Sequence, residues 1–112
     1  MIILEVIPVN KIAIYCRVDS CGNSASLQHA AAHQKVSLEQ FASTKKYIVV
    51  AYYDDIGYAG HDMSRPGLLA LNTDYDKGLF DAVLVVNRSR LYRGDAWSEP
   101  NWSFPVMSLT DA

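Results

Sequence analysis

The chain has 112 residues, 50% of them hydrophobic, which is enough for one small domain with a single core and too little for two. Its formal net charge of −2 excludes a protein that binds nucleic acid or an anionic membrane through overall charge. Any such affinity must be local, and the three arginines within residues 88–95 predict a basic edge on a neutral body.

The amino-terminal residues and the cysteines predict a cytoplasmic protein. Residues 1–9 are apolar but short, and they carry Glu5 and Pro8 without a basic flank, so neither a signal peptide nor a membrane anchor is expected. Cys16 and Cys21 are too close in sequence for a stabilising disulfide, which favours two free thiols in a reducing compartment.

The first half of the chain predicts a strand, a helix and a second strand. Residues 12–18 form a short apolar run, typical of a strand buried on both faces. From Ser26, apolar side chains recur every three or four residues, which predicts an amphipathic helix to about Lys45. The β-branched and aromatic run 47–53 predicts the next strand, and the aspartates and glycines of residues 54–60 predict a loop after it.

The second half repeats this alternation. Ser64 is expected to accept hydrogen bonds from the free backbone donors of a helix that runs up to Gly78. Residues 79–86 are the most apolar run and predict the central strand, with a loop over residues 87–95 beyond its carboxyl end. Residues 106–109 predict a last strand.

Strands that alternate with helices imply parallel pairing, right-handed crossovers and helices on both faces of the sheet. The predicted fold is therefore α/β, a three-layer sandwich with a mostly parallel central sheet of the flavodoxin-like kind. Ligands of such sheets bind beyond the carboxyl ends of the strands, which places Arg17, Arg65, Arg90 and Arg93 along one edge. Because guanidinium groups grip phosphate through paired hydrogen bonds, this edge predicts a phosphodiester site.

Other residues permit alternatives. Asp54 and Asp55 at a strand end could bind a metal for phosphate chemistry, although capping of a turn is the commoner use. His29 and His33 have a helical spacing that could hold zinc, but no third ligand is nearby in sequence. A nucleotide-binding flavodoxin-like protein is disfavoured because no glycine-rich loop follows the first strand. We therefore predict neither a metal nor a cofactor.

Three separated motifs lie on these elements: Ala13-Ile14-Tyr15-Cys16-Arg17-Val18; Asp55-Ile56-Gly57-Tyr58-Ala59-Gly60 with Arg65-Pro66-Gly67-Leu68; and Ser89-Arg90-Leu91-Tyr92-Arg93. In order and placement they resemble the catalytic domain of serine recombinases, the resolvase and invertase family. The resemblance implies a resolvase-like fold and site-specific DNA recombination, as in DNA integration by mobile elements. In that reaction a serine attacks a backbone phosphate and forms a 5′-phosphoserine link before strand exchange.

The resemblance also implies roles for individual residues. By matched position, Arg17, Arg65, Arg90 and Arg93 are the expected phosphate-binding arginines, and Tyr15 matches a tyrosine of the family's site. Fixed cations suit this chemistry, because the pentacoordinate transition state carries more negative charge than the diester.

The expected nucleophile is the one departure at the site. The family places its serine two residues after the first arginine, and that position is Asp19, with Ser20 immediately behind it. A carboxylate about 4 Å from a phosphate charge repels it by roughly 4 kcal/mol at an effective dielectric near 20. Ser20 is the predicted nucleophile if the loop shifts by one residue. Otherwise the domain is a non-catalytic module for DNA association or self-association, so its standing as an enzyme stays open.

The implied partners are double-stranded DNA and further copies of the chain, as a homodimer and as a tetramer in the synaptic complex. Residues 1–112 are expected to form a single resolvase-like catalytic domain. The family's long dimerisation helix and carboxyl-terminal DNA-binding domain have no counterpart after the fourth strand, so this domain is expected to be truncated.

Overall fold

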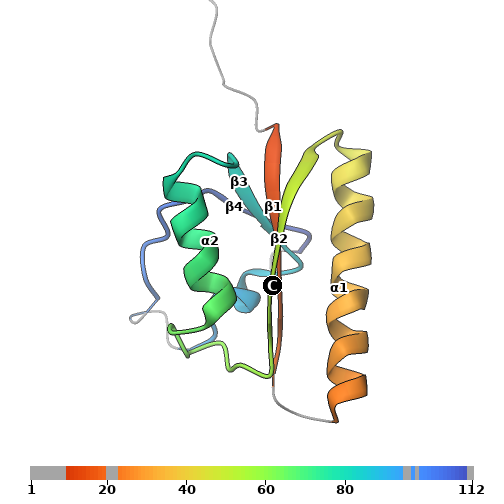
Figure 1. Cartoon of the computed structure of the whole chain (residues 1–112), viewed down its shortest axis with the longest axis vertical. Coiled ribbons are helices and arrows are strands. Elements are labelled where there is room, and N and C mark those ends of the chain that lie inside the picture. Colours follow the sequence, from red (N-terminus) through yellow and green to blue (C-terminus); the bar gives the residue numbers. More distant parts are fainter. Residues whose placement is uncertain (1–9, 20–22, 95–96, 98, 111–112) are drawn as a thin grey trace, which may run out of the picture.

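The computed structural model describes residues 10–19, 23–94, 97 and 99–110. In chain order, its elements are β1 (Lys11–Val18), α1 (Ser24–Thr44), β2 (Ile48–Ile56), α2 (Pro66–Asp76), β3 (Ala82–Val85), the 3-10 turn η1 (Arg88–Arg90) and β4 (Val106–Ser108). All described strands pair in parallel, in the order β2-β1-β3-β4. Helix α1 lies on one face of the sheet and α2 on the other (Figure 1), which confirms the predicted α/β sandwich.

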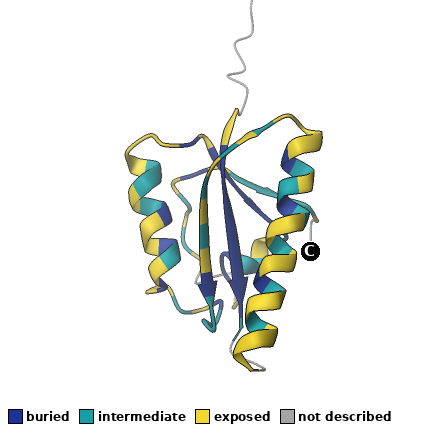
Figure 2. Cartoon of the chain, turned by 45° about the vertical axis from the view of Figure 1, so that its right-hand side comes forward, coloured by how far each residue is buried: buried dark blue, intermediate teal, exposed yellow. Residues whose placement is uncertain are grey.

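Strand β1 contributes side chains to two hydrophobic cores. Successive residues of a strand point to opposite faces, so Ile14 and Cys16 pack towards α1 whereas Ala13 and Tyr15 pack towards α2. Every residue of β1 after Lys11 is buried, as predicted for a strand covered on both faces. Figure 2 shows this buried centre, with exposed residues on the outward sides of the helices and along the edge strand β2.

Strand β2 is longer than predicted and lies at the edge of the sheet. It continues to Ile56 instead of ending at Tyr53, because Asp54 and Asp55 still pair with the last residues of β1. The longer strand brings Asp55 directly opposite Arg17. Three residues predicted to lie in a loop, Asp54, Asp55 and Ile56, therefore belong to the sheet.

Strand β3 is shorter than predicted. It covers Ala82–Val85, whereas the apolar run predicted a strand over 79–86. Before it, Phe80 lies in the core beside α2 and Leu79 is half-exposed, while the N–H of Asp81 donates to the carbonyl of Lys11 at 2.7 Å. β3 nevertheless lies inside the sheet, between β1 and β4, and all of its residues are buried. Its predicted inner position is confirmed.

The start of α2 is capped from β2, not by the predicted serine. The backbone N–H groups of Gly67 and Leu68 donate to the carboxylate of Asp55, at 2.7 and 2.9 Å, while Ser64 instead donates to Asp62. A carboxylate there also complements the positive end of the helix dipole. Capping, not metal binding, is thus the role that the structure gives to Asp55.

Helix α1 begins two residues before the predicted Ser26, and the side-chain oxygen of Asn23 accepts a hydrogen bond from the N–H of Ser26 at 2.8 Å. His29 and His33 on this helix are exposed. Among the described residues, no group of three His, Cys, Asp or Glu side chains could hold a metal ion. No helix in the described part of the chain is long and apolar enough to cross a membrane.

Candidate functional site

The carboxyl ends of β1, β2 and β3 bring distant arginines to one edge of the sheet. Arg17 lies near the carboxyl end of β1. Its Nε donates to the main-chain carbonyl of Arg90, 73 residues away, at 3.0 Å. Nη1 of Arg65, just before α2, donates to the same carbonyl at 3.0 Å. Three segments therefore meet at one point, as the topology predicted.

Arg17 is wholly buried, and each of its three guanidinium nitrogens donates to a main-chain oxygen. Its Nη2 donates to the carbonyl of Ser89 at 2.9 Å and its Nη1 to that of Tyr58 at 3.0 Å. From α1, the side chain of Gln34 accepts from the N–H of Arg17 at 3.3 Å and donates to its carbonyl at 2.9 Å. Arg17 thus ties the loops after β2 and β3 to the central strand.

Arg65 is also fully buried, and it belongs to a chain of hydrogen bonds that runs to α2. Its Nη1 donates to the hydroxyl of Tyr15 at 3.1 Å, and this hydroxyl donates to Asp55 at 2.6 Å. Its Nη2 donates to the carbonyl of Leu91. Burial, together with the hydrogen bond to Asp55, raises the pKa of Tyr15, so the phenol stays protonated. Burial lowers the pKa of Arg65.

Arg90 and Arg93 are the more accessible pair. Arg90 is half-buried and donates from Nη1 to the carbonyl of Arg17 at 3.3 Å, while its Nε has no partner among the described residues. Burial and the charge of Arg17 lower the pKa of Arg90. The side chain of Arg93 is 67% exposed. The site therefore has two fully buried arginines, Arg17 and Arg65, one half-buried arginine, Arg90, and one exposed arginine, Arg93.

An acidic side chain lies among these cations. The carboxylate of Asp19 accepts from Nη1 of Arg17 and, at 3.2 Å, from Nη1 of Arg93. Partial burial raises the pKa of Asp19, but the hydrogen bond and charge of Arg17, aided by Arg93 and Arg90, outweigh it, so the net pKa is lowered. Asp19 is therefore ionised at neutral pH. Ser20, the predicted nucleophile, lies outside the described residues.

Two residues without a predicted role help to build the site. Gly60 allows Arg17 and Arg93 to approach, since a Cβ at Gly60 would lie 2.9 Å from Nη2 of Arg17 and 2.5 Å from the Cβ of Arg93. The other is Gln34, and its signal was present in the sequence: it is a polar residue within the apolar stripe of the first helix.

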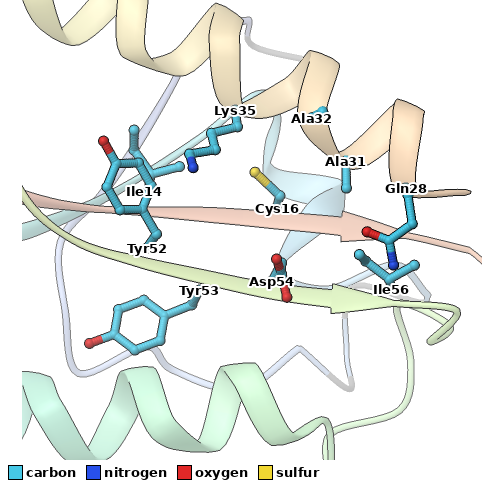
Figure 3. A pocket seen from close by; sticks show the side chains of 10 residues that line it. All are labelled: Ile14, Cys16, Gln28, Ala31, Ala32, Lys35, Tyr52, Tyr53, Asp54 and Ile56. Carbon is cyan, nitrogen blue, oxygen red and sulfur yellow. The ribbon is translucent and has the colours of Figure 1, made fainter.

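A cavity of about 200 Å³ lies elsewhere, between α1 and strands β1 and β2 (Figure 3). Cys16, Lys35 and Asp54 contribute to its lining, and none of the four matched arginines does. Burial raises the pKa of the Cys16 thiol to about 12, so the thiol is protonated and a poor nucleophile at neutral pH. The cavity is thus separate from the arginine site.

Several solved structures are similar to this chain in sequence and fold. The chain is similar to the C-terminal catalytic domain of ISC1926 TnpA, an IS607-like serine recombinase, with 30% identity and a TM-score of 0.67 over 76% of this chain and 57% of that one. The N-terminal catalytic domain of TP901-1 integrase gives 30% identity and a TM-score of 0.64 over 76% and 60%. A serine recombinase from Sulfolobus solfataricus gives 28% and 0.58 over 75% and 54%.

The chain thus spans less than two thirds of the length of these solved structures. No curated protein matches it. A family-wide comparison is more decisive, because the family described as "Resolvase, N terminal domain" matches residues 12–97, well over half of the chain. The chain belongs to the resolvase N-terminal domain family.

Proposed function

We propose that this domain binds the phosphodiester backbone of double-stranded DNA at its arginine edge, as the catalytic domain of a site-specific serine recombinase. The observation that carries the proposal is the joint grip of Arg17 and Arg65 on the carbonyl of Arg90, which fixes the loop bearing Arg90 and Arg93. Membership of the resolvase family and the likeness to serine recombinase domains support it.

The arginines divide the work. Arg93 contacts a phosphate first, because its side chain is the most exposed of the four, and Arg90 joins it from the same loop. Arg65 acts as a positioning residue in this arrangement, because its two terminal nitrogens already donate to Tyr15 and to main-chain oxygens. Arg17 holds the same loop, and its Nη1, which donates to Asp19, is also within reach of a phosphate that takes the place of that carboxylate. Cations held in advance lose little free energy to reorganisation when charge develops on the phosphate.

We infer that Ser20 is the nucleophile. Its oxygen would bond to phosphorus as its proton leaves and the bond from phosphorus to the 3′ oxygen breaks, which gives a 5′-phosphoserine link and a free 3′ hydroxyl. Two neighbouring groups are poor substitutes, because the phenol of Tyr15 and the thiol of Cys16 are both buried with raised pKa values. A homodimer, and a tetramer during strand exchange, belong to the same proposal.

Duplex binding tests the first part. Fluorescence anisotropy of a labelled duplex at low salt should show weak binding, and Arg90→Ala or Arg93→Ala should each reduce affinity on the order of fivefold to tenfold. Arg88→Ala is the matched control, because Arg88 lies in the same segment, is half-exposed and pairs with Glu99 at 3.8 Å. An equal loss in all three variants, or no binding at low salt, would refute the proposal.

Strand cleavage is tested separately. Duplexes drawn from DNA that flanks the gene should trap a covalent protein–DNA adduct with the wild-type chain, and Ser20→Ala should abolish it. Binding without any adduct would favour a second candidate function, a non-catalytic module for DNA association or self-association. The position of Asp19 favours this second candidate, since its carboxylate contacts both Arg17 and Arg93 where the family has its serine.

A further inference from the structure

The carboxylate of Asp19 has the chemistry of a bound anion. One of its oxygens accepts from Arg17 on β1 and the other accepts from Arg93, which follows η1. A phosphodiester oxygen pair would require this same bridge between two guanidinium groups. The side chain of Asp19 is 35% exposed, so the bridge lies at the surface, where a phosphate could reach it.

The charges around Asp19 favour an anion between Arg17 and Arg93, whether it is a carboxylate or a phosphate. Arg17, Arg90 and Arg93 all lower the pKa of Asp19, so three positive charges act on one carboxylate. Gly60 keeps Arg17 and Arg93 adjacent, because a side chain at residue 60 would collide with both. The fold thus leaves room for this bridge, and its Arg17 end is fixed because Arg17 is wholly buried.

We propose that Asp19 is an internal competitor of phosphate: its carboxylate holds the anion position between Arg17 and Arg93, and a phosphate binds there only by displacing it. When a phosphate replaces the Asp19 carboxylate, the arginines gain few new ion pairs. The wild-type domain therefore binds phosphate weakly. For DNA, this inference rests on the proposed function, but it also applies to a simple inorganic anion.

Sulfate is the probe that separates the two proposals. Titration with sodium sulfate, followed through the side-chain Nε–H resonance of Arg93, should give an affinity about tenfold higher in Asp19→Asn than in wild type. Asp76→Asn is the matched control, because it changes net charge equally from an exposed position at the far end of α2. The double variant Asp19→Asn with Arg93→Ala, followed through Arg90, should lose the gain.

A second test uses the wild-type chain and so does not depend on whether any variant folds. Its Asp19 carboxylate carbon resonance should shift as sulfate displaces the side chain, with the same midpoint as the resonance of Arg93. A gain in Asp19→Asn within twofold of that in Asp76→Asn would overturn the inference, as would an Asp19 resonance that does not respond while Arg93 does.

Duplex binding by the same variants then tells the two failures apart. Tighter sulfate binding in Asp19→Asn with no duplex binding by any variant would contradict the proposed function and leave the internal competitor standing. Duplex binding that weakens in Arg93→Ala but is unchanged in Asp19→Asn would support the proposed function and contradict the internal competitor.

Discussion

Removal of the Asp55 carboxylate should destabilise the domain strongly. Asp55 is 2% exposed and accepts from the hydroxyl of Tyr15 at 2.6 Å and from the backbone N–H groups of Gly67 and Leu68. In Asp55→Ala, loss of a helix cap costs about 0.5–2 kcal/mol, and buried donors left without partners add roughly 1–3 kcal/mol. We expect the free energy of unfolding to fall by about 2–4 kcal/mol.

Urea unfolding followed by circular dichroism measures this loss. With a slope of about 2 kcal/mol per molar urea, the middle of the range for small domains, the midpoint should fall by about 1–2 M. Asp54→Ala is the matched control, because Asp54 is the exposed neighbour on the same strand. Tyr15→Phe should cost less in the Asp55→Ala background than alone, since the two groups share a hydrogen bond. A loss no larger than in Asp54→Ala would refute the capping argument.

Three further outcomes are expected. Gly60→Ala should weaken duplex binding several-fold at unchanged helix content, because its Cβ would lie 2.5 Å from the Cβ of Arg93 and force Arg93 away from Arg17; wild-type affinity would contradict this. In a Cys21→Ser background, Cys16 should resist a thiol reagent at pH 8, and its contribution to stability should be lost as pH rises from roughly 8.5, the unfolded pKa, towards about 12. Rapid labelling of the folded protein would be inconsistent with its burial. Asp19→Ser should raise the yield of trapped adduct, measured by gel shift, because it removes the carboxylate that lies between Arg17 and Arg93. An unchanged yield would argue against that competition.

The layer order and the edge that carries the site could be predicted from the sequence, because both follow from the alternation of strands and helices. The details that failed depend on contacts between distant residues. A local capping rule selects Ser64, yet Asp55 reaches the same helix end from the neighbouring strand. Apolar character alone does not distinguish Leu79, which pairs with no strand, from the residues of β3.

The burial of two arginines could not be predicted in this way. An arginine at the end of a strand or just before a helix is expected to face solvent. Arg17 and Arg65 are buried because the segment after β3 folds over them and offers its carbonyls. Burial of a charged group requires such partners, and these partners lie many residues away in the chain. The motif thus identified the arginines, and only the fold showed which of them remain accessible.

The salt dependence of duplex affinity tests most directly whether the arginine edge binds DNA phosphate. In a plot of log affinity against log salt concentration, the negative slope should become shallower by about 0.9 in Arg93→Ala, because one phosphate contact is removed. Arg88→Ala should keep the wild-type slope. Equal slopes in wild type and Arg93→Ala would contradict the account.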